Sequence, residues 1–323
     1  MPEWLYEDGI GEERAVRIEN GRIAEARILR HDGINAGLVA QVQLVKQLVA
    51  GKRGIVQLPS GEEMLMSPLP KDITQGASLI AQVTRAAITE AARDKLPLCR
   101  PAVDVKICAA PTLREQIGDA RLCHAHETDI FAQYGWHEVI EEARTGLTAF
   151  AGGSLIVSIT PAMTVIDVDG DLPSLPLAIA AAAASAQAIT RLDLQGSIGI
   201  DFPGVASKAE RQAIADALDA AMTGPHERTS VNGFGFLQIV KRRTGPSLPE
   251  MLQHDRMTAH ALEFMRMAER SKGTGALTLA AHPALITKLE LYPAWLEQLA
   301  QRTGRAVSLR SDAKLTISGY YAE

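Results

Sequence analysis

Two short stretches decide the fold of this chain: LIVSITPAMTVIDVDG at Leu155–Gly170 and GSIGIDF at Gly196–Phe202. Within them, Met163–Val168 and Ser197–Phe202 are rich in β-branched residues and too short for helices, which predicts two buried strands. The residues between them, Pro176–Leu192, are mostly Ala, Leu and Ile without glycine, which favours a helix that packs through small side chains. The predicted pattern is strand, helix, strand.

An aspartate stands at or near the end of each predicted strand. A strand–helix–strand unit almost always closes as a right-handed crossover with parallel strands, so both strands would end at one edge of the sheet. Open α/β sheets usually hold their ligands at that edge. Asp167 and Asp201 would meet there, and two carboxylates suit Mg²⁺. The same residues also fit a purely structural interpretation, in which Asp167 and Asp169 begin a turn at Gly170 and Asp201 caps a loop.

The composition is typical of a globular chain of two or three compact units, with 323 residues, 46% hydrophobic and 22% charged. No apolar run is long enough to span a bilayer, and the acidic N-terminus lacks a charged-then-apolar leader, so we expect neither a membrane segment nor secretion. The three cysteines form no CxxC pair, which argues against a disulfide framework and predicts a reducing cytoplasm. They are Cys99, Cys108 and Cys123. The net charge of −5 means that nucleic-acid binding would need a local basic patch.

The N-terminal part reads as a hairpin followed by a small barrel. Asn20-Gly21 separates two alternating runs and predicts a type I′ hairpin turn. From Ile34 to about Ile88, short apolar runs alternate with Gly, Pro and Ser clusters, which favours a barrel, with an OB-type barrel as one candidate. No Phe, Tyr or Trp occurs from Arg30 to Arg100, so this unit lacks platforms for stacking unpaired bases. Its basic residues could contact phosphates or only aid solubility: Lys46, Lys52, Arg53 and Lys71.

The middle of the chain predicts a strand at Pro101–Ala110 and a helix at Asp129–Arg144. Between them, His124 and His126 would share one face of a strand. That spacing allows a transition-metal site, but it lacks the CxxC or HExxH pattern of recognisable zinc sites. Ordinary histidines on a half-exposed strand are the alternative.

The C-terminal third begins with a further strand, Ser230–Val240, which runs directly into three cations, Lys241-Arg242-Arg243. At a strand end near the carboxylates these cations could clamp phosphates, or they could form a solvated charged turn. Leu248–Arg270 then predicts a helix. The tail, 276–323, alternates strands with helices that start at prolines, which predicts a small α/β unit.

Taken together, these segments resemble the catalytic region of the ribonuclease E/G family of bacterial endoribonucleases. The resemblance rests on three motifs in the family's order and spacing: GGSLIVSITPAMTVIDVDG (Gly152–Gly170), SIGIDF (Ser197–Phe202) and NGFGFLQIVKRRTGPSL (Asn232–Leu248). It implies a fold of the α/β class, with several domains in a multidomain α+β arrangement. The implied units are an RNase H-like domain (1–33 and 98–150), an inserted OB-type RNA-binding barrel (34–97), a DNase I-like catalytic subdomain (151–248), and a linker helix with a small α/β domain (249–323).

The resemblance also implies the roles of individual residues. Asp167 and Asp201 would bind the catalytic Mg²⁺, for which Mn²⁺ could substitute, and Asp169 would be an additional ligand at a position often occupied by asparagine. A basic set would hold the RNA backbone: Lys241, Arg242, Arg243 and Arg228. The implied activity is hydrolysis of single-stranded RNA in RNA processing or decay, leaving 5′-phosphate and 3′-hydroxyl ends.

The sequence departs from the family pattern in three ways. Pro249–Arg256 contains no cysteine, so we expect no structural zinc and no zinc-linked tetramer, while a homodimer stays open. The segment before Asp129 is too short for the family's 5′-end sensor, and the barrel's aromatic positions are empty. These departures favour an alternative, a weak or inactive RNA-binding protein, for example one acting on ribosomal RNA. A DNA-directed metal phosphodiesterase is a third possibility that the sequence leaves open.

Overall fold

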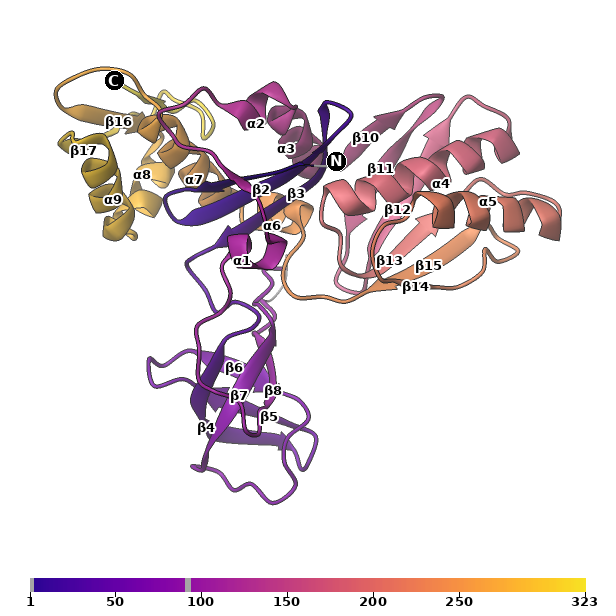
Figure 1. Cartoon of the computed structure of the whole chain (residues 1–323), viewed down its shortest axis with the longest axis horizontal. Coiled ribbons are helices and arrows are strands. Elements are labelled where there is room, and N and C mark those ends of the chain that lie inside the picture. Colours follow the sequence, from indigo (N-terminus) through magenta and orange to yellow (C-terminus); the bar gives the residue numbers. More distant parts are fainter. Residues whose placement is uncertain (1–2, 91–93) are drawn as a thin grey trace.

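The computed structural model describes residues 3–90 and 94–323 and combines three open sheets with one closed barrel (Figure 1). This mixed α/β architecture agrees with the predicted fold class. Residues 91–93, which belong to the predicted barrel unit, lie outside the described residues, as do residues 1–2. In the described part of the chain, every helix is too short or too polar to cross a membrane.

A six-stranded sheet contains both motif strands, in the order β10-β11-β12-β13-β15-β14. Its strands are β10 (Leu147–Phe150), β11 (Gly153–Ile159), β12 (Thr164–Gly170), β13 (Gly196–Asp201), β14 (Glu227–Arg228) and β15 (Phe236–Lys241). Helix α4 (Ser174–Arg191) joins β12 to β13, and these two strands are parallel, as predicted. Helices α4 and α5 (Lys208–Ala221) lie on the same face of the sheet (Figure 1). The other face carries exposed side chains.

Helix α4 is apolar on nearly every side because it packs between two sheets. It contacts β11 and β12 on one side and β3 (Arg22–Arg30) of the N-terminal sheet on the other. Its alanines Ala178, Ala182 and Ala186 are 0% exposed and belong to a core that also includes Val16 and Ile23 of the N-terminal sheet. Small side chains let the helix approach both sheets closely. The N-terminal sheet and the six-stranded sheet therefore share one hydrophobic core.

The N-terminal sheet has the order β3-β2-β1-β9 and contains the predicted hairpin. Asn20 (φ 52°) and Gly21 (φ 73°) have the positive φ values of a type I′ turn between β2 (Glu12–Glu19) and β3. The other elements of this part are β1 (Glu3–Asp8), β9 (Arg121–Leu122), α1 (Leu113–Ile117), α2 (Ile130–Gln133) and α3 (Trp136–Thr145). The single helix predicted at Asp129–Arg144 is wrong, because Gly135 (φ 96°) separates α2 from α3.

The barrel closes with the strand order β4-β5-β6-β8-β7 and extends away from the rest of the molecule (Figure 1). Its strands are β4 (Val39–Val49), β5 (Arg53–Gln57), β6 (Glu63–Met66), β7 (Ser78–Arg85) and β8 (Leu98–Pro101). The expected boundary at residue 97 therefore leaves out the strand that closes the barrel. The strand predicted at Pro101–Ala110 is also wrong beyond Pro101, because only Cys108 pairs there, in an isolated bridge to Val39.

The C-terminal unit follows two helices, α6 (Leu248–His254) and α7 (Arg256–Glu269). The sequence predicted one helix here, but Asp255 has a non-helical backbone (φ −118°, ψ 54°) and separates them. The tail contains β16 (Leu277–Ala281), α8 (Pro283–Glu290), α9 (Pro293–Thr303), β17 (Val307–Ser311) and β18 (Tyr321–Ala322), with β16 central in the sheet. Ile10, from the turn between β1 and β2, is buried in the core of this unit.

A buried ion network fastens α7 to the N-terminal sheet. Arg14 of β2 is 1% exposed, and its Nη2 donates to both carboxylate oxygens of Glu7 at 2.9 Å. Its guanidinium lies 4.7 Å from the ring centroids of both Phe131 and Trp136. Arg270, the C-cap residue directly after α7, also pairs with Glu7. One carboxylate thus balances two arginines from different parts of the chain.

Replacing Glu7 with glutamine should destabilise the protein strongly, because Arg14 and Arg270 would both lose the charge that balances them. We expect the free energy of unfolding to fall by about 3 kcal/mol, measured by urea denaturation. The matched control is Glu19→Gln. The Glu19 side chain is 52% exposed and pairs with Arg17, so this substitution should change the free energy of unfolding by less than about 1 kcal/mol. Equal effects of the two substitutions would contradict a structural role for the network.

Candidate active site

Asp167 and Asp201 lie side by side on the exposed face of the six-stranded sheet. The parallel register pairs Asp167 of β12 directly with Asp201 of β13, which separates their Cα atoms by about 4.8 Å. Their neighbours Ile166 and Ile200 are 0% exposed and face the helices. Because side chains alternate along a strand, both carboxylates point to the opposite, open face. This is the juxtaposition that the strand–helix–strand pattern predicted, while their role as metal ligands stays a prediction.

The chemistry of this pair suits a divalent cation. Like charges directly opposite each other on neighbouring strands are destabilising, and in the described part of the chain no Lys, Arg or His forms an ion pair with either carboxylate. Mg²⁺ needs only one or two protein carboxylates and keeps several of its waters. Asp167 and Asp201 therefore fit a magnesium ion that completes its shell with solvent.

Asp169 shares the face of Asp167 but lies farther along β12. It pairs with Ser154 of β11 and has no neighbour on β13, which ends at Asp201. Within residues 3–90 and 94–323, no three His, Cys, Asp or Glu side chains gather as a metal site. Asp169 therefore does not form a three-ligand group with the other two aspartates in the described residues, and its role as a ligand stays a prediction.

An aromatic residue that the sequence reasoning did not single out lies beside the pair. Phe236 of β15 pairs with Asp201, so its side chain shares the open face. A Cβ atom on Gly199 would come within 2.4 Å of Phe236 Cζ, which means that the ring lies across the glycine. The repeated phenylalanine of Gly233-Phe234-Gly235-Phe236 was the only signal of this feature in the sequence.

The basic end of β15 lies far from the aspartates, so its expected position near them is wrong. Strand β15 is antiparallel to β13, and Lys241 pairs with Gly196 at the opposite end of β13 from Asp201. Five residues of strand separate the two positions, or about 16 Å. The expectation failed because it treated the end of β15 as though β15 ran parallel to β13.

Two of the four predicted phosphate-binding cations have acidic partners. Arg243 pairs with Glu250, and Nε of Arg228 donates to Asp219 Oδ1 at 2.6 Å. Arg242 is exposed, and no acidic side chain of the described residues pairs with it. Arg242 is therefore the member of the set that is most available to a phosphate.

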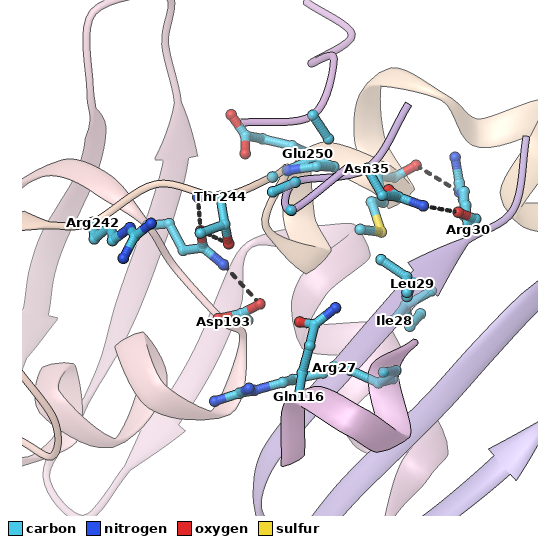
Figure 2. Close-up of a pocket in the computed structure, with 18 of the residues that line it drawn as sticks. Arg27, Ile28, Leu29, Arg30, Asn35, Gln116, Asp193, Arg242, Thr244 and Glu250 are labelled. Carbon is cyan, nitrogen blue, oxygen red and sulfur yellow. Dashed lines mark hydrogen bonds between the residues drawn. The ribbon is translucent and has the colours of Figure 1, made fainter. Parts of the chain in front are cut away.

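Lys241 faces a cleft of about 960 Å³ at the junction of β3, the segment before β13 and the end of β15. Figure 2 shows Asp193, Arg242 and Thr244 on one side of this cleft and Leu29 and Arg30 on the other. Burial raises the pKa of Asp193 to about 6, against the opposing charge of Arg27, and burial lowers the pKa of Lys241. The cleft has mixed charge and lies at the other end of β13 from the aspartate pair.

The histidine pair does not form the expected strand. His124 and His126 lie in a turn after β9, where their rings stack with centroids 5.3 Å apart. They belong to no cluster of metal-ligating side chains among the described residues. The structure supports ordinary histidines at this position.

Comparison with known proteins gives a consistent result. Residues 70–244, just over half of the chain, match the model of the Ribonuclease E/G family, and this range includes both aspartates. Ribonuclease G of Escherichia coli K12 is 28% identical over 131 residues, which are 37% of this chain and 27% of that protein. Ribonuclease G of Haemophilus influenzae is 27% identical over 188 residues, 52% of this chain and 38% of that protein. The chain thus spans about a third of the length of these curated relatives, and it belongs to the ribonuclease E/G family.

Proposed function

We propose that the chain is a Mg²⁺-dependent endoribonuclease that hydrolyses phosphodiester bonds in single-stranded RNA, in RNA processing or decay. The observation that carries this proposal is the register that sets Asp167 beside Asp201 on an open sheet face. Family membership supports it, and so do the names of the ribonuclease relatives. A cytoplasmic location, a homodimer, Mn²⁺ as a substitute ion and the absence of structural zinc are further parts of the proposal.

The mechanism begins with the two carboxylates. Asp167 and Asp201 would hold the ion between neighbouring strands, where the sheet fixes their backbone positions. When bound, Mg²⁺ would polarise a phosphate oxygen and lower the pKa of a water molecule that it binds. Both aspartates are exposed on this face, where an extended RNA strand would cross β12 and β13 with the bond to be cut beside the carboxylates. The family resemblance suggests 5′-phosphate and 3′-hydroxyl products.

We infer that the remaining units guide the RNA. The barrel has five strands in a non-sequential order, with β6 and β8 parallel, which supports an OB-type assignment. Its exposed cations could follow the RNA backbone, and they include Lys46, Lys52, Arg53 and Lys71. Arg242 could contact a phosphate of the RNA some distance from the bond to be cut. The RNase H-like and DNase I-like assignments of the two sheets belong to the same proposal.

A second candidate is a weak or inactive RNA-binding protein derived from this family, for example one that acts on ribosomal RNA. Two observations favour it. In the described residues Asp169 does not join the other two aspartates as a three-ligand group, and Lys241 lies at the opposite end of β13. Both weaken a complete catalytic centre without affecting RNA binding elsewhere.

Replacing Asp167 or Asp201 with asparagine should slow cleavage about 100-fold or more, because each substitution removes a charged ligand from the ion. The measurement is cleavage of an internally labelled single-stranded RNA with Mg²⁺. The matched control is Asp119→Asn. Asp119 is exposed and lies outside the six-stranded sheet, so this variant should cut RNA at the wild-type rate. Undiminished cutting by either site variant would remove that aspartate from the active site.

Metal removal should separate cleavage from binding. With EDTA we expect the wild-type protein to stop cutting RNA but to keep binding it, and added Mg²⁺ should restore cutting. DNA of the same sequence, tested in parallel, should resist cleavage. Binding without cleavage under every metal condition would favour the second candidate, and equal cutting of DNA would favour a general metal phosphodiesterase.

A further inference from the structure

We propose that Phe234 is a stacking platform for an unpaired nucleobase next to the nucleotide held at Asp167 and Asp201. The inference rests on the proposed function for the identity of the substrate, and on the structure for the position of the ring. Phe234 is 89% exposed, whereas the five other phenylalanines of the chain are buried or half-buried. Phenylalanine is among the residue types most often fully buried in folded proteins.

The loop that carries Phe234 is fixed by hydrogen bonds rather than left as a mobile tip. Asn232 Oδ1 accepts from the backbone N–H of Phe234 at 2.8 Å and from that of Phe236 at 3.1 Å. The N–H of Gly235 also donates to the carbonyl of Asn232 at 3.2 Å. An asparagine that bonds the backbone after it is a typical turn stabiliser. The ring is therefore held out into solvent by an ordered backbone.

The same loop is docked against the end of β13. Gly235 has φ 90°, and a Cβ atom there would come within 2.4 Å of the carbonyl oxygen of Phe202. The N–H of Phe202 donates to the carbonyl of Gly235 at 3.2 Å. Only glycine fits at this contact, which fixes Phe234 relative to Asp201, the residue just before Phe202.

The distance to the aspartates suits an adjacent nucleotide. Phe236 pairs with Asp201, and Phe234 precedes it by two residues, so the Cα atoms of Phe234 and Asp201 are at most about 12 Å apart. Phe236 lies across Gly199 on the same open face. Phe236 thus lies beside the carboxylates and Phe234 is in the adjoining turn, although the barrel strands contain no aromatic residue.

The surroundings of Phe234 favour a nucleobase over a protein partner. Its exposed neighbours in the sequence, Ser230, Asn232 and Gly233, are polar or small, so this loop supplies no other apolar side chain toward a broad apolar patch of the kind that marks protein interfaces. Unpaired bases stack on aromatic side chains with little sequence preference, because every base has a π face. A single flat ring beside a phosphate-processing site matches that ligand.

The first test measures binding without cleavage. A short fluorescein-labelled single-stranded RNA is titrated in EDTA, and Phe234→Ala should weaken binding about 5- to 100-fold. Phe234→Trp should preserve binding, and Phe234→Leu, which keeps the apolar bulk but loses the π face, should weaken it. Leu291→Ala, at another exposed apolar residue (69%), is the control and should bind as the wild type does. Thermal unfolding should be unchanged in all four variants.

The second test identifies the ligand as a base. RNAs that carry 2-aminopurine at successive positions should show quenching at one position with the wild type and Phe234→Trp, but not with Phe234→Ala. An abasic nucleotide at that position should weaken wild-type binding by the same factor as Phe234→Ala, and the two changes should not add. With Mg²⁺, Phe234→Ala should raise KM more than it lowers kcat.

The outcomes separate this proposal from the nuclease assignment. If the protein cuts no RNA but Phe234→Ala still abolishes the quenching and weakens binding, the platform stands and the nuclease fails. If the protein cuts RNA while Phe234→Ala leaves affinity and quenching unchanged, the platform is wrong and the nuclease stands. Weaker binding without position-specific quenching would indicate another kind of contact and overturn the platform, as would failure of the wild type to bind RNA at all.

Discussion

The parallel pairing of β12 with β13 is the constraint on which the rest of this protein depends. Ile166 and Ile200 are completely buried against the helices, and because side chains alternate, the residue after each isoleucine must face the opposite side. A slip of one residue would turn the isoleucines to water and an aspartate into the core. The apolar core therefore holds two like charges side by side, in an arrangement that electrostatics alone would oppose.

The helix between these strands extends the constraint to the N-terminal part of the chain. Helix α4 has small side chains on both of its buried sides, so it packs closely against the six-stranded sheet and the N-terminal sheet and joins them in one core. The Arg14 network then attaches α7, and Ile10 enters the C-terminal core. The aspartates thus stand on a scaffold to which most of the chain contributes, which limits how far the two carboxylates can separate.

The two ends of β13 have different chemistry. At one end, Asp201 lies beside Asp167 and Phe236 on an open face. At the other end, Lys241 and Asp193 line a cleft. Burial there raises the pKa of Asp193 and lowers the pKa of Lys241, so it favours the neutral form of each side chain. Charge alone would have made the basic end the place to look for phosphate binding. At the aspartate end the neighbour is the aromatic Phe236, and no cation of the described residues forms an ion pair with either aspartate. This arrangement suits the bases of a substrate whose phosphate would be neutralised by a metal ion.

The sequence by itself determined the features that depend on local pattern: the hairpin at Asn20-Gly21, the strand–helix–strand unit, the barrel, and the meeting of Asp167 with Asp201. That meeting follows from the parallel direction of two strands joined by one crossover. It could not determine the direction of β15, and so misplaced Lys241, nor the closing of the barrel by β8 or the helix break at Asp255. The sequence contained Phe234 and Phe236 but gave no reason to connect them with the aspartates. Strand direction and loop docking are set by hydrogen bonds between residues far apart in the chain, such as that between Phe202 and Gly235. The periodicity of apolar residues shows only which face of a helix or strand is buried. The tertiary structure decides which other elements that face packs against.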